Sequence, residues 1–552
     1  MNFQIPPHLH ARLNLQPDPA GTPGAVRIVL PLQANMAADT VGRWADGPRR
    51  DHAAMVFEQA DGTLQTASFA AVDDEATRLA QHLRSRGIGK GDRVAIHTGL
   101  RPETGVAHLA VYKLGAIAVT LSQLYGIDTL RHVLDRSEAA VIVTQAAAWQ
   151  PFRSEAFPHL RHRIVVGGHD RFEGDAEIAY ERAIAERADG FVAAITHADD
   201  PALLMFTSGS TGLPKGMRHG HRILQAYLPS IALFFDLDLD DDGSVFWSPA
   251  DWAWVGGLLD LLLAAWAFGH TVVTSEARFD AEWAFDFMTR QRVTHTFLTP
   301  TALKRLAEVP KPRERWPGLK LRVICTGGEP LPGQVLDWCQ NELGVVCNEF
   351  YGLTEVNHLI GNCRALAPPI AGSMGLAYPG HGTTVVDEHG TELPPGGVGE
   401  IVTRADDATQ FLGYWRDPER TAALRLSNRW LRTGDIGLRD AAGYFWYRGR
   451  ADDLIKSAGY RIGPAEVEEC LLRHPAVAEA AVIGIPDAAR GQIVKAVVRL
   501  KAGHAADHLM TLSLQQHVKT RLASYKYPRV IDYVQRFEMT SSGKIDRKPL
   551  RG

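Results

Sequence analysis

The feature that most constrains this chain is the loop at residues 207–216, which reads T-S-G-S-T-G-L-P-K-G. The apolar run at residues 203–206 comes directly before it and predicts a buried strand that delivers the loop to a sheet edge. Glycines, hydroxyl side chains and Lys215 can together surround a polyphosphate with backbone N–H groups, hydroxyl donors and a cation. The sequence therefore predicts a phosphate-binding loop.

Two other functional loops are excluded by the residue order. Lys215 is followed by Gly216, where a Walker A loop needs the magnesium-binding Ser or Thr. Ser208 stands two positions before Ser210, where a nucleophile elbow requires glycine. A solvated Gly/Ser surface loop remains the alternative, so further motifs have to decide.

Length, charge and cysteine usage narrow the class of protein. A chain of 552 residues exceeds a single core, and its formal charge of -4 gives no case for nucleic acid or a membrane surface. The most apolar run, residues 258–268, is too short to cross a bilayer and carries Asp260, and residues 1–19 lack a signal-peptide core. The five cysteines are widely spaced without a C-x-x-C pair. We expect a cytoplasmic protein without disulfides, zinc, a nucleic-acid partner or a membrane span.

The chain alternates strand-like and helix-like runs over most of its length, which is typical of a layered α/β domain with parallel strands. The stretch up to about Asp46 is Pro-rich and predicts an extended lead-in on the surface. Strands are expected at residues 94–98, 116–121, 141–144, 245–248, 271–274, 294–298 and 321–325, with helices at 103–114, from 300 and at 333–343. Two α/β halves would therefore flank the loop at residues 207–216.

The pattern changes after Pro368 and again near Arg450. Short β-like runs at residues 383–386 and 399–403, separated by turns, predict a small antiparallel barrel or sheet. The tail predicts a compact unit with helices at 464–473 and 512–522 and strands at 480–485, 494–500 and 529–534. We expect an α/β fold of two layered α/β subdomains plus a small β-barrel in residues 1–450, and a small α+β domain in residues 451–552.

Three short motifs carry further chemistry. G-G-E-P at residues 327–330 follows a strand, where a parallel sheet gathers ligands and glycines admit a planar base. Y-G-L-T-E at residues 351–355 places a hydroxyl beside a carboxylate, which suits magnesium. T-G-D at residues 433–435 offers a carboxylate that can accept both hydroxyls of a ribose. Taken singly, each motif is also compatible with an ordinary turn or a packed loop.

The order of these motifs resembles the adenylate-forming superfamily of acyl-CoA synthetases, peptide-synthetase adenylation domains and luciferases. The resemblance extends through Y-R-G-R-A-D-D at residues 447–453, I-K-S-A-G-Y-R-I-G-P at 455–464 and T-S-S-G-K at 540–544, and it covers about residues 50–550. It is closest to acetyl-CoA-synthetase-like and medium-chain acyl-CoA synthetases. The resemblance implies ATP, Mg²⁺ and coenzyme A as cofactors, and a C-terminal domain that moves.

The resemblance also implies a role for each matching residue. Contact with the ATP phosphates is implied for Thr207, which we count among the catalytic residues, and for Ser208, Gly209, Ser210, Thr211, Gly212 and Lys215. Adenine contact is implied for Gly328, Glu329, Pro330 and the stacking ring of Tyr351, phosphate contact for Thr354, and magnesium binding and catalysis for Glu355. Asp435 and Arg450 would bind ribose and phosphate, Asp452 would be the hinge, Gly459 would line the pantetheine tunnel and Arg461 would face phosphate.

Lys544, on the Gly-containing loop at residues 540–544, is the implied catalytic cation. It would offset the negative charge that develops while a carboxylate attacks the α-phosphate of ATP. In the family the C-terminal domain then rotates and a thiol displaces AMP. We therefore expect an AMP-forming acid–thiol ligase that adenylates a carboxylic acid, releases pyrophosphate and transfers the acyl group to coenzyme A. An adenylation enzyme that delivers to a carrier protein and a non-catalytic nucleotide-binding protein are the alternatives.

The acyl pocket is expected around residues 248–257, a segment that resembles the family's strand-to-helix lining of the acyl site. Its expected residues are Trp254, Val255, Gly256, Gly327 and Gly352. Acetate-selective relatives close the pocket with a tryptophan where this chain has Gly352, so we expect a short-to-medium-chain, branched or aromatic acid. Each buried methylene would add about 0.8 kcal/mol. Trp252 capping the pocket is the alternative.

Overall fold

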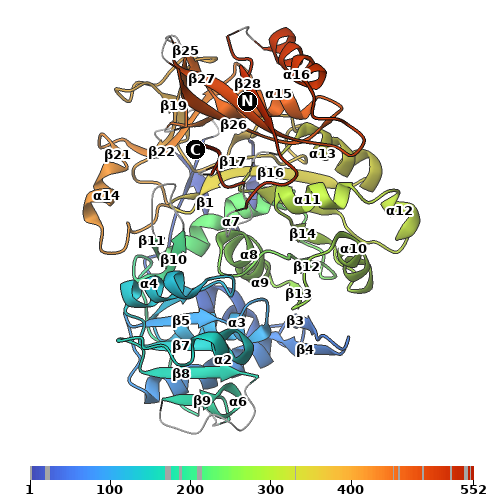
Figure 1. Ribbon diagram of the computed structural model, residues 1–552. Helices are drawn as coiled ribbons and strands as arrows, with labels where there is room; N and C mark the ends of the chain where they lie inside the picture. Colours follow the sequence, from blue (N-terminus) through green and yellow to red (C-terminus); the bar gives the residue numbers. More distant parts are fainter. Residues whose placement is uncertain are drawn as a thin grey trace.

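The structure, a computed structural model, describes residues 3–18, 25–167, 176–185, 189–207, 214–329, 331–451, 453–457, 460–487, 490–522, 525–539, 545–547 and 549–551. Figure 1 shows a blue-to-cyan sheet at one end of the molecule, a green-to-yellow sheet in the middle and an orange-to-red tail at the other end. None of the helices in these ranges is long and apolar enough to cross a membrane.

The N-terminal sheet has seven strands. Their order is β11 (Lys215–Gly220), β10 (Pro201–Thr207), β6 (Ile117–Thr120), β5 (Arg93–His97), β7 (Val141–Gln145), β8 (His162–Val166) and β9 (Glu177–Ala179). All neighbours are parallel except the β10–β11 hairpin. Its accompanying helices include α2 (Phe69–Ser85), α3 (Pro102–Lys113) and α4 (Ile127–Ser137).

The central sheet has nine strands. Their order is β18 (Leu376–Ala377), β17 (Asn357–Gly361), β16 (Val346–Leu353), β15 (Val323–Gly327), β14 (His295–Phe297), β12 (Val245–Trp247), β13 (Thr271–Ser275), β3 (Ala53–Glu58) and β4 (Leu64–Ser68). The strands from β3 to β16 in this order are parallel, and β17, β18 and β4 add antiparallel edges. The carboxyl ends of β12, β14, β15 and β16 therefore lie at one edge, where ligands of parallel sheets gather.

Helices packed around this sheet carry much of the buried core. They are α7 (Arg222–Phe234), α8 (Val255–Gly257), η4 (Leu258–Leu263), α9 (Ala264–Phe268), α10 (Ala281–Arg290), α11 (Pro300–Ala307), α13 (Gly333–Trp338) and η5 (Cys339–Leu343). The apolar run at residues 258–268 forms η4 and α9, and all its side chains are buried, including Asp260. A helix that is apolar all round belongs in a protein core.

The last two parts of the chain form separate sheets. β19 (Thr384–Val386), β20 (Val398–Arg404), β21 (Arg425–Leu426), β22 (Trp430–Arg439) and β23 (Phe445–Arg450) make an antiparallel sheet, with α14 (Pro418–Ala423) beside it. The tail sheet comprises β24 (Ile455–Ser457), β25 (Tyr460–Ile462), β26 (Val477–Asp487), β27 (Gly491–Leu500) and β28 (Val530–Tyr533), covered by α15 (Pro464–Leu472) and α16 (His508–Arg521). The tail has its own apolar core.

The predicted fold class is confirmed: the molecule is mixed α/β, with a large N-terminal part and a small C-terminal part. The boundary between residues 450 and 451 stays a prediction. The surface lead-in is wrong, because Phe3, Leu13, Met36 and Val41 are buried in the main core and β1 (Leu15–Pro17) pairs with β2 (Val26–Ile28). The apolar residues of this segment stand among prolines without a regular period, so no sequence pattern predicts that they are buried.

The remaining elements are short. They are η1 (Pro7–Leu9), η2 (Ala38–Gly42), α1 (Arg43–Ala45), α5 (Ala146–Trp149), η3 (Gln150–Phe152), α6 (Tyr180–Ala183), α12 (Pro312–Arg315) and η6 (Pro549–Arg551). All five cysteines are buried free thiols.

Candidate functional site

The hairpin of β10 and β11 carries the described ends of the glycine-rich loop. Thr207 ends β10, Lys215 begins β11, and the two residues are paired in the antiparallel register. The predicted phosphate contacts Ser208, Gly209, Ser210, Thr211 and Gly212 lie outside the described residues.

Lys215 meets Glu355 and Tyr414 in what we call the Lys215 cluster. Lys215 Nζ donates to Tyr414 Oη at 2.8 Å and to Glu355 Oε1 at 3.2 Å, and Tyr414 Oη donates to Glu355 Oε1 at 2.5 Å. The ammonium also lies 4.5 Å from the centre of the Tyr414 ring, within the range of a cation–π contact. The structure thus brings together two residues that the sequence motifs place 140 positions apart.

Tyr414 is a member of this cluster that sequence reasoning missed. The segment around it runs beside β11, since Trp415 N donates to Gly216 O at 2.8 Å and Arg218 N donates to Gly413 O at 3.2 Å. Burial and the negative charge of Glu355 raise the pKa of Tyr414, so its hydroxyl keeps its proton. A G-Y-W run at residues 413–415 was the available signal.

Glu355 is also the residue that could hold a divalent metal. Among the described residues there is no group of three or more His, Cys, Asp or Glu side chains able to hold a metal ion. A single carboxylate suits Mg²⁺, which dehydrates reluctantly and takes most of its ligands from water and substrate phosphates. The donor set therefore fits the predicted ion. Thr354 directly precedes Glu355 in the loop after β16.

A second group, the Asp435 cluster, contains Tyr351, Asp435 and Arg450. Tyr351 Oη donates to Asp435 Oδ2 at 2.7 Å, and Arg450 Nη1 lies 3.4 Å from Asp435 Oδ1. Asp435 and Arg450 are cross-strand partners in β22 and β23, which explains their meeting. Burial, followed by the charge of Asp435, raises the pKa of Tyr351. The residues that the motifs assign to adenine and ribose are thus in direct contact.

The G-G-E-P turn leaves the carboxyl end of β15. Gly328 has a φ of +88°, a left-handed conformation that favours glycine. Glu329 Oε2 accepts a hydrogen bond of 2.9 Å from Thr301 Oγ1, and Leu331 N donates to Glu349 Oε1 at 3.1 Å. These bonds hold both ends of the turn. Pro330 lies outside the described residues.

The expected acyl-site glycines lie against aromatic rings. A Cβ atom on Gly256 would lie 2.5 Å from Cε1 of Phe297, and one on Gly327 would collide with the ring of Phe350. Gly352 has a different reason to be glycine, because a Cβ there would collide with the main-chain oxygen of Asn357 on β17. That Gly352 opens the acyl pocket, by standing where acetate-selective relatives have tryptophan, stays a prediction.

Trp254 and Val255 open helix α8 at the same place. Trp254 is the N-cap residue of α8, and its ring meets Tyr125 edge-on at 6.1 Å. Trp252, the residue considered as a cap, is buried in the main core. Thr120 Oγ1 donates to Ala253 O at 2.9 Å and so ties this segment to the N-terminal sheet.

An aromatic layer lies behind the glycines and was not predicted. It comprises Phe234, Phe297, Phe350 and His358, whose neighbouring ring centres are 3.6 to 6.4 Å apart. Tyr227, Asp260 and His358 form a polar group against this layer, which we call the Asp260 cluster. The only sequence signal was an acidic residue inside the apolar run at 258–268.

The structure describes only the neighbours of the site residues that we assign to the C-terminal part. The hinge Asp452, the tunnel residue Gly459 and the catalytic Lys544 lie outside the described residues, as does the side chain of Arg461. Arg547, three positions after Lys544, donates to Glu468 Oε1 and Oε2 at 2.7 and 2.9 Å and lies 3.7 Å from Asp453. The end of the chain is therefore tied to α15 and to the residue after the expected hinge.

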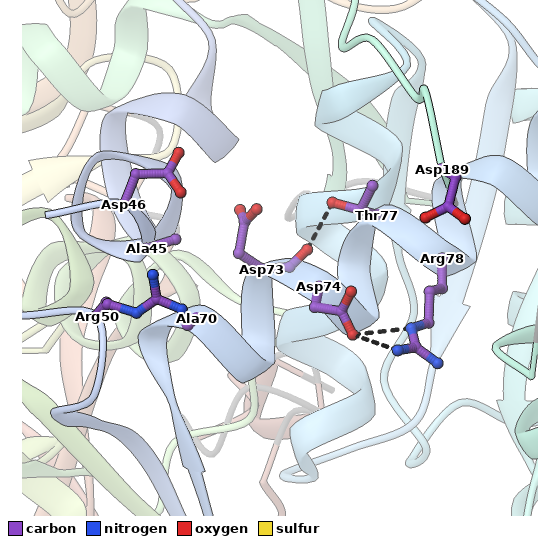
Figure 2. A pocket seen from close by; sticks show the side chains of 9 residues that line it. All are labelled: Ala45, Asp46, Arg50, Ala70, Asp73, Asp74, Thr77, Arg78 and Asp189. Atoms are coloured by element: carbon purple, nitrogen blue, oxygen red, sulfur yellow. Dashed lines mark hydrogen bonds and ion pairs between the residues drawn. The ribbon is translucent and has the colours of Figure 1, made fainter. Parts of the chain in front are cut away.

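Two surface hollows are found among the described residues. One lies beside the Lys215 cluster, and the other lies away from the expected site residues. One of about 480 Å³ opens beside the Lys215 cluster, where Tyr414 helps to line it. Another, of about 280 Å³, is lined by residues of α1 and α2 (Figure 2), where Asp74 pairs with Arg78 and Thr77 Oγ1 donates to the main-chain oxygen of Asp73. The second hollow contains none of the expected site residues.

Comparisons with known proteins cover nearly the whole chain. A family model described as "AMP-binding enzyme" matches residues 42–415, and one described as "AMP-binding enzyme C-terminal domain" matches residues 466–544. The acetyl-coenzyme A synthetase of Bacillus subtilis is 32% identical over 522 residues, which are 94% of this chain and 90% of that protein. The mitochondrial acyl-coenzyme A synthetase ACSM4 of Mus musculus is 34% identical over 540 residues, 95% of this chain and 91% of that protein.

A solved structure gives the same picture in three dimensions. The benzoate CoA ligase from Burkholderia xenovorans LB400 superposes with a TM-score of 0.81 at 26% identity. The match covers 94% of this chain and 100% of that one. The likeness therefore includes both the large part and the tail.

Proposed function

This chain belongs to the family of AMP-binding enzymes and is an ATP-dependent acyl-CoA synthetase, and we propose that the Lys215 and Asp435 clusters carry its nucleotide chemistry. The resemblance inferred from the motifs is confirmed. The enzyme joins a carboxylic acid to coenzyme A in an AMP-forming reaction that uses ATP and Mg²⁺. The observation that carries the proposal is the contact of Lys215 with Glu355, which joins the two motif regions.

The chemical problem is that a carboxylate is a poor acylating agent, because its leaving group would be oxide. Transfer of AMP gives a mixed anhydride and pyrophosphate, and a thiol then displaces AMP. In our proposal Lys215 and the loop from Thr207 hold the outer phosphates, and Glu355 supplies the carboxylate for Mg²⁺. Tyr351, Asp435 and Arg450 position the nucleoside. The protein contributes placement and charge neutralisation and no covalent nucleophile.

Lys544 is proposed as the cation at the attacked α-phosphate, and residues 451–552 as a unit that turns about Asp452. The bonds from Arg547 to Glu468 and its approach to Asp453 support this assignment, since they couple the chain end to the hinge region. When the unit turns, Lys544 leaves and Gly459 arrives to line the thiol path. Five buried free thiols suit a reducing compartment, and we propose the cytoplasm.

The acid is proposed to be an aromatic, branched or short-to-medium-chain one. The rings of Phe297 and Phe350 beside Gly256 and Gly327 support an apolar acyl site with flat walls. The benzoate CoA ligase among the structural neighbours is consistent with the aromatic choice.

Exchange of labelled pyrophosphate into ATP tests the first half of the reaction. We expect exchange that depends on a carboxylic acid and falls by about 100-fold or more in Lys544→Ala, as for loss of a transition-state charge partner. Thioester formed with free coenzyme A then tests the second half. No exchange with any acid from two to ten carbons, or with benzoate, would contradict the proposal, and exchange without thioester would favour delivery to a carrier protein.

A further inference from the structure

The Asp260 cluster lies directly behind the glycines expected at the acyl site. Asp260 is on η4, about one turn after Gly256 on the same helical stretch. His358 is on β17, where it is the cross-strand partner of Gly352. Tyr227 comes from α7, and its hydroxyl donates to Asp260 Oδ1. Three elements that are distant in the sequence thus bring polar groups together in the interior.

This cluster is completely buried and only partly paired. The side chains of Asp260 and His358 are 0% exposed, and His358 Nε2 lies 3.5 Å from Asp260 Oδ1. Asp260 Oδ2 and His358 Nδ1 have no hydrogen-bond partner within the part of the chain that the structure describes. A buried polar atom left without a partner destabilises the folded state, and more so when it is charged. Such an atom calls for a missing partner.

The protonation states tell which partner is missing. Burial lowers the pKa of His358, so the imidazole is neutral near pH 7. Burial and the nearby Asp260 raise the pKa of Tyr227, so its hydroxyl stays a donor to Oδ1. Asp260 Oδ2, buried and without a partner among the described residues, is the place in this cluster where a donor from outside can bind.

The side chains around the Asp260 cluster indicate the shape of the molecule that carries this donor. The ring of His358 is tilted by 39° against that of Phe350 with ring centres 3.6 Å apart, and it also contacts Phe234 at 4.9 Å and Tyr227 at 4.6 Å. Phe297 continues this layer to Gly256. Aromatic side chains prefer stacked or edge-on neighbours, so the layer suits a flat ring. The helical turn between Gly256 and Asp260 spans ~5.4 Å. A donor group that reaches Asp260 therefore stands on the ring edge away from the carboxylate of the acid substrate.

We propose that Asp260, oriented by Tyr227 and flanked by His358, selects an aromatic acid that carries a hydroxyl or amino group meta or para to its carboxylate. The shared chemistry of the two groups is a hydrogen-bond donor aimed at Asp260 Oδ2. This inference rests on the proposed function, because it gives the acid of the same reaction.

A second buried Asp–His pair in this chain shows what a purely structural pair looks like. Asp407 and His381 are also fully buried. Both oxygens of Asp407 are used: His381 Nδ1 lies 2.9 Å from Oδ2, Thr403 Oγ1 donates to Oδ2 at 3.1 Å, and Thr409 Oγ1 donates to Oδ1 at 2.7 Å. The chain thus completes a buried carboxylate with its own groups at one place and leaves an oxygen of Asp260 open at the other.

The first experiment uses the unaltered enzyme, so it does not depend on whether a variant folds. Acid-dependent pyrophosphate exchange is measured with benzoate, with 3- and 4-hydroxybenzoate, with 3- and 4-aminobenzoate, and with 3- and 4-methylbenzoate, which match the donors in size. We expect kcat/KM for the best donor acid to exceed that of its methyl analogue by about 100-fold, because the analogue leaves Asp260 Oδ2 unpaired. Hydroxy and amino acids at the same ring position then identify the donor.

The second experiment tests whether removal of the Asp260 carboxylate changes the preference for donor-bearing over methyl-substituted acids. Asp260→Leu removes the acceptor, so the ratio of kcat/KM between the hydroxy or amino acid and the methyl acid should fall close to one or invert. Asp407→Asn is the matched control, since it alters a buried Asp–His pair elsewhere. It should lower the thermal midpoint and leave the substrate ratio unchanged.

The outcomes separate this inference from the function beneath it. Absence of exchange with every acid contradicts the synthetase proposal itself. Exchange that is equal for donor and methyl acids, or highest for aliphatic acids, overturns the role of Asp260 while leaving the synthetase in place. A donor preference that persists in a folded Asp260→Leu variant overturns it as well.

Discussion

The charged groups of the Lys215 and Asp435 clusters bond to other members of the same cluster, whereas the Asp260 cluster has a carboxylate oxygen without a partner among the described residues, although each cluster has a member on β16, on β17 or in the turn between them. Glu355 is bound by Lys215 and Tyr414, and Asp435 is bound by Tyr351. Asp260, by contrast, keeps one oxygen without a partner in the described chain. We interpret the difference as a division of labour between a nucleotide side that is preorganised and an acid side that its substrate completes.

The comparison has a consequence for substitutions. A change on the nucleotide side should slow adenylation of every acid by the same factor. A change on the acid side should alter which acid is used and leave ATP binding in place. The predictions below test this separation.

Lys215→Ala should have the largest effect, a loss of about 100- to 1000-fold in adenylation rate, because a cation at the ATP phosphates is removed from a preorganised site. The loss should be the same for all acids that the enzyme accepts, as measured by pyrophosphate exchange. Lys113→Ala is the control, since Lys113 pairs with Asp73 at 2.9 Å on the N-terminal α/β layer. Unequal losses among acids would break the separation.

Gly256→Ala should be the next in size and should act on the acid side. Its Cβ would lie 2.5 Å from Cε1 of Phe297, so the ring has to move or the helix has to shift. Such overpacking costs about 1–3 kcal/mol, which corresponds to roughly 5- to 150-fold in kcat/KM for a ring-shaped acid. The KM for ATP should stay unchanged.

Gly126→Ala is the matched control for that substitution. An added Cβ at Gly126 meets nothing within 4 Å, so the kinetics should be preserved, while the thermal midpoint should fall slightly because Gly126 is the N-cap residue of α4, where alanine is disfavoured. If Gly256→Ala raised the KM for ATP as strongly as it lowered acid use, the two sides of the site could not be treated separately.

How far the sequence could predict this molecule also differs between the two sides. The residues that we propose for the nucleotide side stand in short continuous motifs, so the order T-S-G-S-T-G, Y-G-L-T-E and T-G-D predicts them. The layered α/β fold was found because strands and helices alternate with clear periods. Tyr414 was missed because its role depends on a strand-like segment lying beside β11, which only the three-dimensional pairing reveals.

The Asp260 cluster on the acid side could not be predicted because its residues come from three elements with no shared motif. Asp260, His358 and Tyr227 are single polar residues in otherwise apolar or aromatic surroundings. A lone acid in an apolar run signals a buried polar contact but not its partner. The register of β16 with β17, shifted by a bulge between Tyr351 and Gly352, pairs His358 with Gly352.

Tyr414→Phe should have a smaller effect than either substitution above. It removes the hydroxyl that lies between Lys215 and Glu355 but keeps the ring beside the ammonium. Loss of one hydrogen bond to a charged group is worth about 1.5 kcal/mol, or roughly tenfold in kcat/KM for ATP. Initial rates at varied ATP check this, and a changed preference among acids would contradict the assignment of Tyr414 to the nucleotide side.

Glu349→Gln should give the smallest kinetic effect and a clear change with pH. Burial raises the pKa of Glu349 to about 8, and its carboxyl accepts the N–H of Leu331 at the end of the G-G-E-P turn. The folded protein therefore binds one more proton than the unfolded chain between the ordinary glutamate pKa and about 8. This contribution to stability is complete below the ordinary pKa and is lost as the pH rises through about 8.

The wild-type free energy of unfolding should accordingly fall between the ordinary glutamate pKa and about pH 8 in urea titrations, and Glu349→Gln should flatten this fall while the KM for ATP changes by less than about threefold. Glu400→Gln is the control, because Glu400 Oε1 also accepts a main-chain N–H, that of Gly434, at 3.1 Å. It should keep the wild-type dependence on pH. If Glu349→Gln instead altered the choice of acid, the carboxyl would have to act across the boundary between the two sides, because Glu349 and Phe350 are adjacent on β16 and their side chains point to opposite faces of the sheet.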